Sequence, residues 1–237
     1  ASVICADMLA LADEMVARFG DNIAKCLTVS DILAAQDASK IAMVLHIEGA
    51  EMISADCHEI EMLYQRGIRS LGPLWSRPNL FGEGVPLQFP GSPDQGDGLS
   101  DAGKRLVRTC NHYGIMLDLS HLNEKGFWDI AKLSDKPLVA THSNVHRLCP
   151  SPRNLTDRQL DAIAESGGIV GLCFATGYLR TDGEKNPDTS LALLVQHCDA
   201  LIETLGEGGV ALGSDFDGAC IPDAIGDCTG MSALEHA

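Results

Sequence analysis

The sequence predicts an α/β protein built on a parallel sheet, and two observations predict it. Short apolar runs alternate with amphipathic stretches along the chain, and this alternation is typical of βαβ units. The chain has 237 residues, a length at which a single α/β barrel domain is common. Neither an internal repeat nor a shift in composition marks a boundary, so residues 1–237 are expected to form one domain.

Six apolar runs are expected to be strands. The first, at 41–47, reads IAMVLHI, a β-branched and nearly continuous apolar run that is typical of a strand buried on both faces. The other five are 68–74, 115–120, 137–141, 168–174 and 210–214.

Helical patterns fall between most of these strands. The first pattern ends before Gly20, a residue that often follows a helix. The helices are expected at 2–19, 55–66, 101–113, 124–133, 157–166 and 190–205, with N-caps at Ser100, Asn123 and Thr156. Residues 75–99 are rich in Gly, Pro, Asp and Ser and are expected to form a long surface loop, of a length that is usually either functional or disordered.

The number of strands bears on the type of fold. A closed (β/α)8 barrel of the TIM type needs eight strands, because closure links strand number, tilt and shear. Six strands are recognisable, the first of them beyond residue 40, and another helix starts at 231–237. We therefore expect a TIM-type barrel that is truncated at both ends, with N-terminal strands and a C-terminal helix missing.

Composition excludes several classes of function. The formal net charge of −16 argues against nucleic-acid binding, which needs clustered Lys and Arg. The nine cysteines include no C-x-x-C pair, so reduced, mostly buried thiols and a cytoplasmic location are expected. The first residues do not resemble a signal peptide, and no uncharged apolar run reaches the length that spans a membrane, about 18 residues.

Four polar residues each follow the end of an expected strand. In a parallel barrel such positions converge on one rim, where barrel active sites lie. Any one of them alone is more often a hydrogen-bonded or capping residue, but four at equivalent places indicate a site with imidazole and carboxylate ligands, which suit zinc. The four are Glu48, His121, His142 and Asp215.

The remaining histidines are interpreted as structural. His46 lies inside a strand and is expected to pack, and His146 lies in a loop, where a helical metal pair with His142 is not expected. His58, His112 and His197 fall in helical patterns and are expected to be solvated or partly buried.

Four segments occur together in order: HIEGAEMI (46–53), LDLSHLN (117–123), THSNVHRLCPSPRNLTD (141–157) and GSDFDG (213–218). With them the chain resembles the renal (membrane) dipeptidase family, peptidase family M19 of the amidohydrolase superfamily. The resemblance implies two Zn²⁺ per subunit, with Glu48 bridging both and His121 and His142 on the second. It also implies that Asp215 contacts the substrate and moves a proton, and that Arg153 holds the substrate's free carboxylate.

The chain departs from the family pattern in two places. The family's first strand carries a His-x-Asp pair, which does not occur here. A family histidine that contacts the substrate near the scissile carbonyl corresponds to Trp75, whose indole N–H donates a hydrogen bond but carries no charge. Trp75 is therefore expected to line the substrate site and to alter its range.

The resemblance implies a zinc-dependent dipeptidase that acts on dipeptides with a free C-terminal carboxylate, through hydroxide supplied by the metals. Two alternatives stay open: another amidohydrolase reaction, such as N-acyl amino acid deacylation or lactone opening, and a non-catalytic barrel that has lost half its metal site. The substrate is the expected partner, and a homodimer is left open.

Overall fold

The computed structural model describes residues 2–237, and every strand ladder in it is parallel. A two-stranded ladder comes first, followed by two ladders of three strands. A parallel bridge between Asp118 and Val139 joins the three-stranded ladders, so that the last six strands follow one another in chain order. The strands are β1 (Ile23–Lys25), β2 (Ile41–Met43), β3 (Leu45–Glu48), β4 (Ile68–Gly72), β5 (Met116–Leu117), β6 (Val139–Ser143), β7 (Ile169–Cys173) and β8 (Val210–Gly213).

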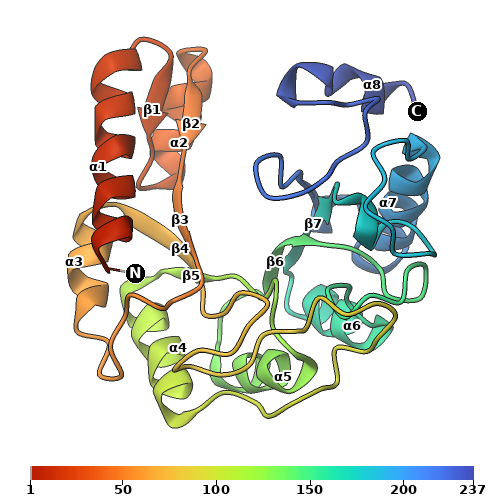
Figure 1. Cartoon of the computed structure of the whole chain (residues 1–237). Helices are drawn as coiled ribbons and strands as arrows, with labels where there is room; N and C mark the ends of the chain where they lie inside the picture. Colours follow the sequence, from red (N-terminus) through yellow and green to blue (C-terminus); the bar gives the residue numbers. More distant parts are fainter. Residues whose placement is uncertain (1) are drawn as a thin grey trace.

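Helices lie outside the arc that these strands form, as Figure 1 shows. They pack apolar faces onto the strands, and the fully buried rings of Phe81, Phe127 and Phe174 belong to this core. The helices are α1 (Ser2–Phe19), α2 (Val29–Asp37), α3 (Glu59–Gln65), α4 (Asp101–Tyr113), α5 (Glu124–Leu133), α6 (Asp157–Glu165), α7 (Leu191–Leu205) and α8 (Ser232–Glu235).

The arc of strands is open. Within residues 2–237, β3 pairs only with β4 and β8 only with β7, so no closed barrel forms. The predicted α/β class with a parallel sheet is confirmed. Each of the two end strands leaves an edge of backbone N–H and C=O groups without a strand partner.

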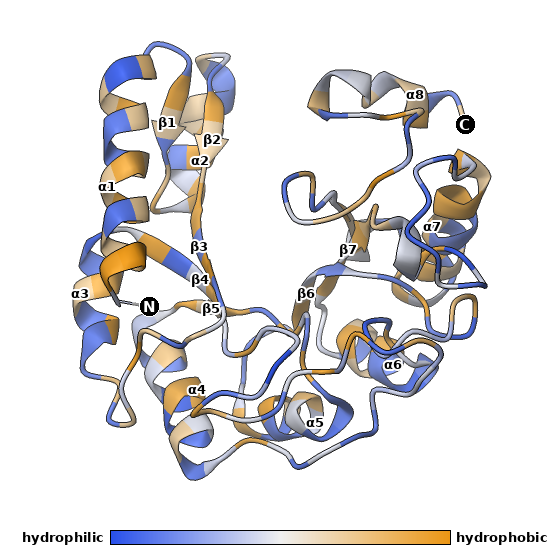
Figure 2. Cartoon of the chain, viewed as in Figure 1, coloured by the Kyte–Doolittle hydropathy of each residue, from blue (hydrophilic) through white to orange (hydrophobic). Residues whose placement is uncertain are grey.

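Two expectations about the N-terminal part are wrong. The run at 41–47 is not one buried strand: it breaks at Val44 into β2 and β3, and Ile41 and Val44 are 66% and 43% exposed. A strand also precedes residue 40, because β2 pairs with β1. An apolar run predicts burial only if another part of the protein covers it, and no other segment within residues 2–237 covers Ile41 and Val44. The hydropathy colours of Figure 2 show orange residues along β2 and β3.

The helices that follow agree with the sequence more closely. α4, α5, α6 and α7 begin and end within one residue of their predicted ranges. Three of them begin at the predicted N-caps. Ser100 accepts a hydrogen bond from Gly103 N and Asn123 from Gly126 N, while Thr156 N donates to Gln159 Oε1 at 2.9 Å at the start of α6. α3 begins four residues later than expected, and α2 was missed although Thr28 and Asp31 form a capping box at its start.

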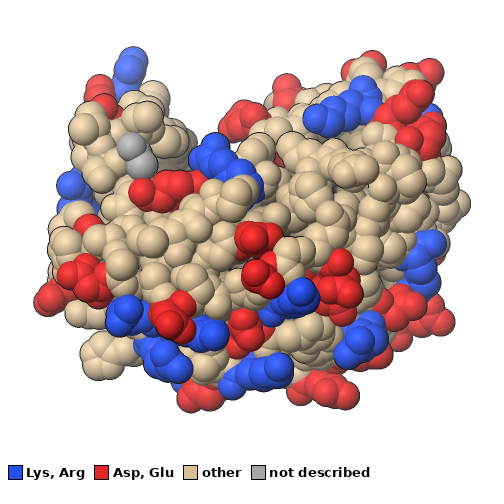
Figure 3. All heavy atoms as spheres, turned by 60° about the horizontal axis from the view of Figure 1, so that its bottom comes forward, with Lys and Arg blue, Asp and Glu red and all other residues tan. Residues whose placement is uncertain are grey.

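The loop at 75–99 contains no helix or ladder strand, as predicted. It returns to the strand ends, where Val85 N donates to His121 O at 2.8 Å. On the face that Figure 3 shows, acidic and basic side chains are mixed, and no large patch of one sign is present there.

All nine cysteines are free, five of them buried. None of the helices within 2–237 combines the length and the apolar character needed to cross a membrane.

His197, on α7, is more buried than expected. It is 1% exposed, its Nδ1 accepts from Val145 N at 3.1 Å, and its Nε2 lies 3.2 Å from Leu179 O. The expectation of a solvated or partly buried side chain is therefore wrong, because α7 turns this histidine toward the loop after β6. Burial lowers the pKa of His197 from 6.5 to about 4, with a smaller contribution from the charge of Arg147.

This neutral histidine is expected to make stability depend on pH. The unfolded chain binds a proton at His197 below about pH 6.5 and the folded chain does not until about pH 4, so stability falls as the pH drops through that window. The difference between the pKa of His197 in the unfolded chain and in the folded chain corresponds to about 3 kcal/mol of unfolding free energy at most. Denaturant unfolding of the parent and of His197→Gln measures it: the parent should lose more stability between these pH values. If the unfolding free energies of the parent and of His197→Gln changed equally with pH, His197 would have a normal pKa in the folded protein.

Candidate active site

Three of the four predicted residues meet at the carboxyl ends of the strands. Glu48 ends β3, His121 follows β5, and His142 lies within β6. Glu48 Oε1 lies 2.9 Å from His121 Nε2 and 3.1 Å from His142 Nε2, and the two Nε2 atoms are 3.1 Å apart. Three donor atoms within 4.8 Å of one another can bind a single cation.

The charge states of two of these groups suit metal binding. Burial alone would raise the pKa of Glu48, but the close approach of the His121 and His142 imidazoles outweighs it and holds that pKa far below its usual range. Burial, together with the charge of Arg153, lowers the pKa of His121 to about 3. At neutral pH the site therefore offers a carboxylate and a neutral imidazole, the forms that bind metal.

The backbone is strained at two of the predicted residues. His121 has φ 70° and Asp215 has φ 57°, values that non-glycine residues adopt at a cost, most often at functional sites. The neighbours of His121 hold its ring in place: Ser76 Oγ lies 2.8 Å from Nδ1, and the Trp75 ring lies 5.6 Å from the imidazole.

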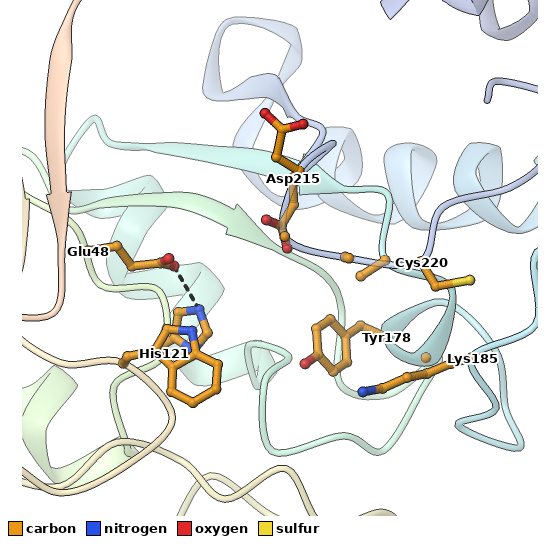
Figure 4. A pocket seen from close by; sticks show the side chains of 12 residues that line it. Glu48, His121, Tyr178, Lys185, Asp215 and Cys220 are labelled. Atoms are coloured by element: carbon orange, nitrogen blue, oxygen red, sulfur yellow. Dashed lines mark ion pairs between the residues drawn. The ribbon is translucent and has the colours of Figure 1, made fainter. Parts of the chain in front are cut away.

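A cavity of about 390 Å³ opens beside these groups. Glu48 and His121 form one wall, and Tyr178, Lys185 and Cys220 line the other, as Figure 4 shows. Trp75 and Asp215 also line the cavity. Burial raises the pKa of Asp215, with a further contribution from the charge of Glu48.

Arg153 lies next to Tyr178 and does not itself line the cavity. It is 3% exposed, its Nη2 donates to His142 O at 3.2 Å, and its guanidinium lies 5.3 Å from the centre of the Tyr178 ring. Its Nε has no hydrogen-bond partner within residues 2–237. A buried N–H without a partner is rare in folded proteins, so this guanidinium has capacity for an anionic ligand.

Sequence reasoning missed Tyr178, Lys185 and Asp118. Tyr178 follows β7 closely, and its place after a strand end was an available signal. His46 was interpreted as packing, but its Nδ1 lies 2.8 Å from Ser70 Oγ and its Nε2 3.7 Å from the carboxylate of Asp118. His46 therefore belongs to a polar group on the inner face of β3.

The family model for membrane dipeptidases, peptidase family M19, matches residues 5–236. The chain belongs to this family.

Individual proteins and solved structures are also similar to this chain. A protein from the pqqA 5′ region of Klebsiella pneumoniae is 47% identical over 226 residues, which cover 95% of this chain and 83% of that protein. The crystal structure of dipeptidase AC, an M19 metallopeptidase, matches 99% of this chain and 68% of its own with 50% identity and a TM-score of 0.97. A metallopeptidase from Rhodobacter sphaeroides, liganded with a phosphinate mimic of L-Ala-D-Ala, matches 96% of this chain and 66% of its own with 52% identity and a TM-score of 0.93. The chain thus spans about two thirds of the length of these two solved chains.

Proposed function

We propose that this chain carries the catalytic site of a metal-dependent dipeptidase that cleaves dipeptides with a free C-terminal carboxylate. The observation that carries the proposal is the meeting of Glu48, His121 and His142 beside a cavity that has room for a dipeptide. The similar R. sphaeroides enzyme, which binds a dipeptide mimic, supports the choice of substrate.

The donor set fits zinc. Two imidazoles and a carboxylate, with one position left open, are typical protein ligands of a catalytic zinc ion. We propose two Zn²⁺ per subunit, with Glu48 bridging them and His121 and His142 on one of them. Bound zinc would polarise the scissile carbonyl and lower the pKa of water.

The other residues of the site act on the substrate and on protons. The raised pKa of Asp215 suits a group that takes a proton from the attacking water and gives it to the leaving amine. The guanidinium of Arg153 offers two parallel N–H donors to the substrate carboxylate, and Tyr178 stands beside it. Trp75 lines the same cavity, and its indole N–H can donate one hydrogen bond to the substrate.

We also propose that the arc closes as an eight-stranded barrel in the complete enzyme. The unpaired edges of β3 and β8, and the apolar groove of about 600 Å³ between α1 and β3, are features that two additional strands would cover. Such strands could bring the remaining ligands of the bridged zinc to Glu48. A crystal structure of a longer form of the protein checks whether the barrel closes.

The nine free thiols fit a reducing compartment, and we propose the cytoplasm.

A substrate panel tests the proposed function. The zinc-loaded protein is assayed with L,L- and L,D-dipeptides, with the same dipeptides amidated at the C-terminus, with N-acyl amino acids and with lactones. We expect hydrolysis of free dipeptides, its loss on removal of zinc by a chelator, and its return when zinc is added.

Two other outcomes would replace the proposal. Faster hydrolysis of N-acyl amino acids or lactones would favour another amidohydrolase reaction, which Trp75 at the substrate site makes the second candidate. Zinc binding without hydrolysis of any of these compounds would indicate a binding protein.

A further inference from the structure

A buried carboxylate lies directly behind one of the candidate metal ligands. Asp118, just beyond the end of β5, is 1% exposed and lines no part of the cavity. Its Oδ1 accepts from Ser120 N at 3.0 Å and from Thr141 N at 2.8 Å, and its Oδ2 accepts from Thr141 Oγ1 at 2.6 Å. Three donors therefore fix the position of this carboxylate.

The Thr141 hydroxyl connects Asp118 to His142. Thr141 Oγ1 also lies 2.9 Å from His142 Nδ1. A hydroxyl has a single proton, and a carboxylate can only accept. Because the proton of Thr141 goes to Asp118, its oxygen must accept, and His142 Nδ1 must be the donor.

We propose that Asp118, acting through the hydroxyl of Thr141, is a positioning residue that holds the His142 imidazole with its proton on Nδ1. This leaves the lone pair of Nε2 directed at Glu48 and His121, where the proposed metal would lie. The inference rests on the proposed function in one respect, namely that His142 is a metal ligand. Metal-binding histidines commonly have their second nitrogen oriented by such a carboxylate.

The arrangement at His121 differs. Its Nδ1 faces Ser76 Oγ at 2.8 Å, and no carboxylate is hydrogen-bonded to that hydroxyl within residues 2–237. Ser76 can therefore donate or accept, and either tautomer of His121 is compatible with it. The orientation imposed through Asp118 is specific to His142.

Asp118→Asn gives a sharp test. The two backbone N–H groups that now face Oδ1 require an oxygen there, so the amide NH₂ takes the place of Oδ2. That NH₂ donates to Thr141 Oγ1, whose proton then turns to His142 Nδ1, and the ring proton moves to Nε2. The variant is thus expected to hold His142 in the tautomer that cannot bind metal through Nε2.

Two measurements follow. Nitrogen-15 NMR of histidine-labelled, metal-free protein should show the His142 proton on Nδ1 in the parent and on Nε2 in Asp118→Asn, with the signal identified by its loss in His142→Gln. Competition with a chelator should show zinc affinity weaker by about 10–100-fold in Asp118→Asn and in Thr141→Val. Thr141→Ser, which keeps the hydroxyl, should bind zinc as the parent does.

Thr204→Val is the matched control, since its hydroxyl bonds only a helix carbonyl, Ala200 O, on α7; zinc affinity should not change in it. If Asp118→Asn does not fold, the Thr141→Val and Thr141→Ser pair decides. A parent with the proton on Nε2, or a Thr141→Val that binds zinc like Thr141→Ser, would overturn the inference. Neither readout uses dipeptide hydrolysis, so an inactive protein with the Nδ1 proton and the predicted affinities would refute the proposed function alone.

Discussion

Glu48→Gln is expected to abolish dipeptide hydrolysis and to lower the zinc content of the protein. The Glu48 carboxylate is the anion that His121 and His142 face, and its depressed pKa keeps it ionised at working pH. Glutamine has nearly the same shape but no charge, so it cannot bridge two cations. We expect kcat to fall at least about 100-fold, since residues that only orient a metal ligand already contribute 10–100-fold.

Metal analysis and steady-state kinetics measure this effect, and Glu51→Gln is its matched control. Glu51 lies three residues further along and pairs with Arg77 at 2.9 Å, outside the group of donor atoms around Glu48. This control should keep both zinc and activity. If Glu48→Gln kept them as well, Glu48 would have no role at the metal.

Arg153→Lys is expected to reduce kcat/KM for free dipeptides about 10–100-fold while leaving the zinc content unchanged. Hydrogen bonds to charged groups contribute about 1.5–3 kcal/mol each, and lysine cannot reproduce the two parallel donors of a guanidinium. The unpartnered Nε of the parent is one of the groups that the substrate would satisfy. C-terminally amidated dipeptides should be poor substrates for the parent, and Arg153→Lys should discriminate less between the free and amidated forms.

Arg158→Lys controls for the loss of a guanidinium elsewhere. Arg158 is exposed on α6, with its guanidinium 5.3 Å from the Trp128 ring, and its substitution should not change the kinetics. Equal rates for free and amidated dipeptides in the parent would remove Arg153 from substrate recognition and leave it as a buried support of His142 through its bond to the backbone carbonyl.

The sequence by itself determined the features that depend on local order along the chain. α4 and α5 follow from their caps at Ser100 and Asn123 and from an apolar face at helical spacing. The expected neighbours Glu48, His121 and His142 follow from a simple rule, because residues that end parallel strands share one rim. Motif order added the family, which the match over 5–236 confirms.

The tertiary structure decided the features that depend on contacts between distant residues. The break at Val44 reflects which strand is available as a partner on each side of it, since β2 pairs with β1 and β3 with β4. The burial of His197 depends on where α7 meets the loop after β6. The hydrogen bonds from Asp118 through Thr141 to His142 cross 23 residues of chain. Propensity and periodicity describe neighbours in sequence, and they contain no information about which side chains the packing of the sheet brings within hydrogen-bonding distance.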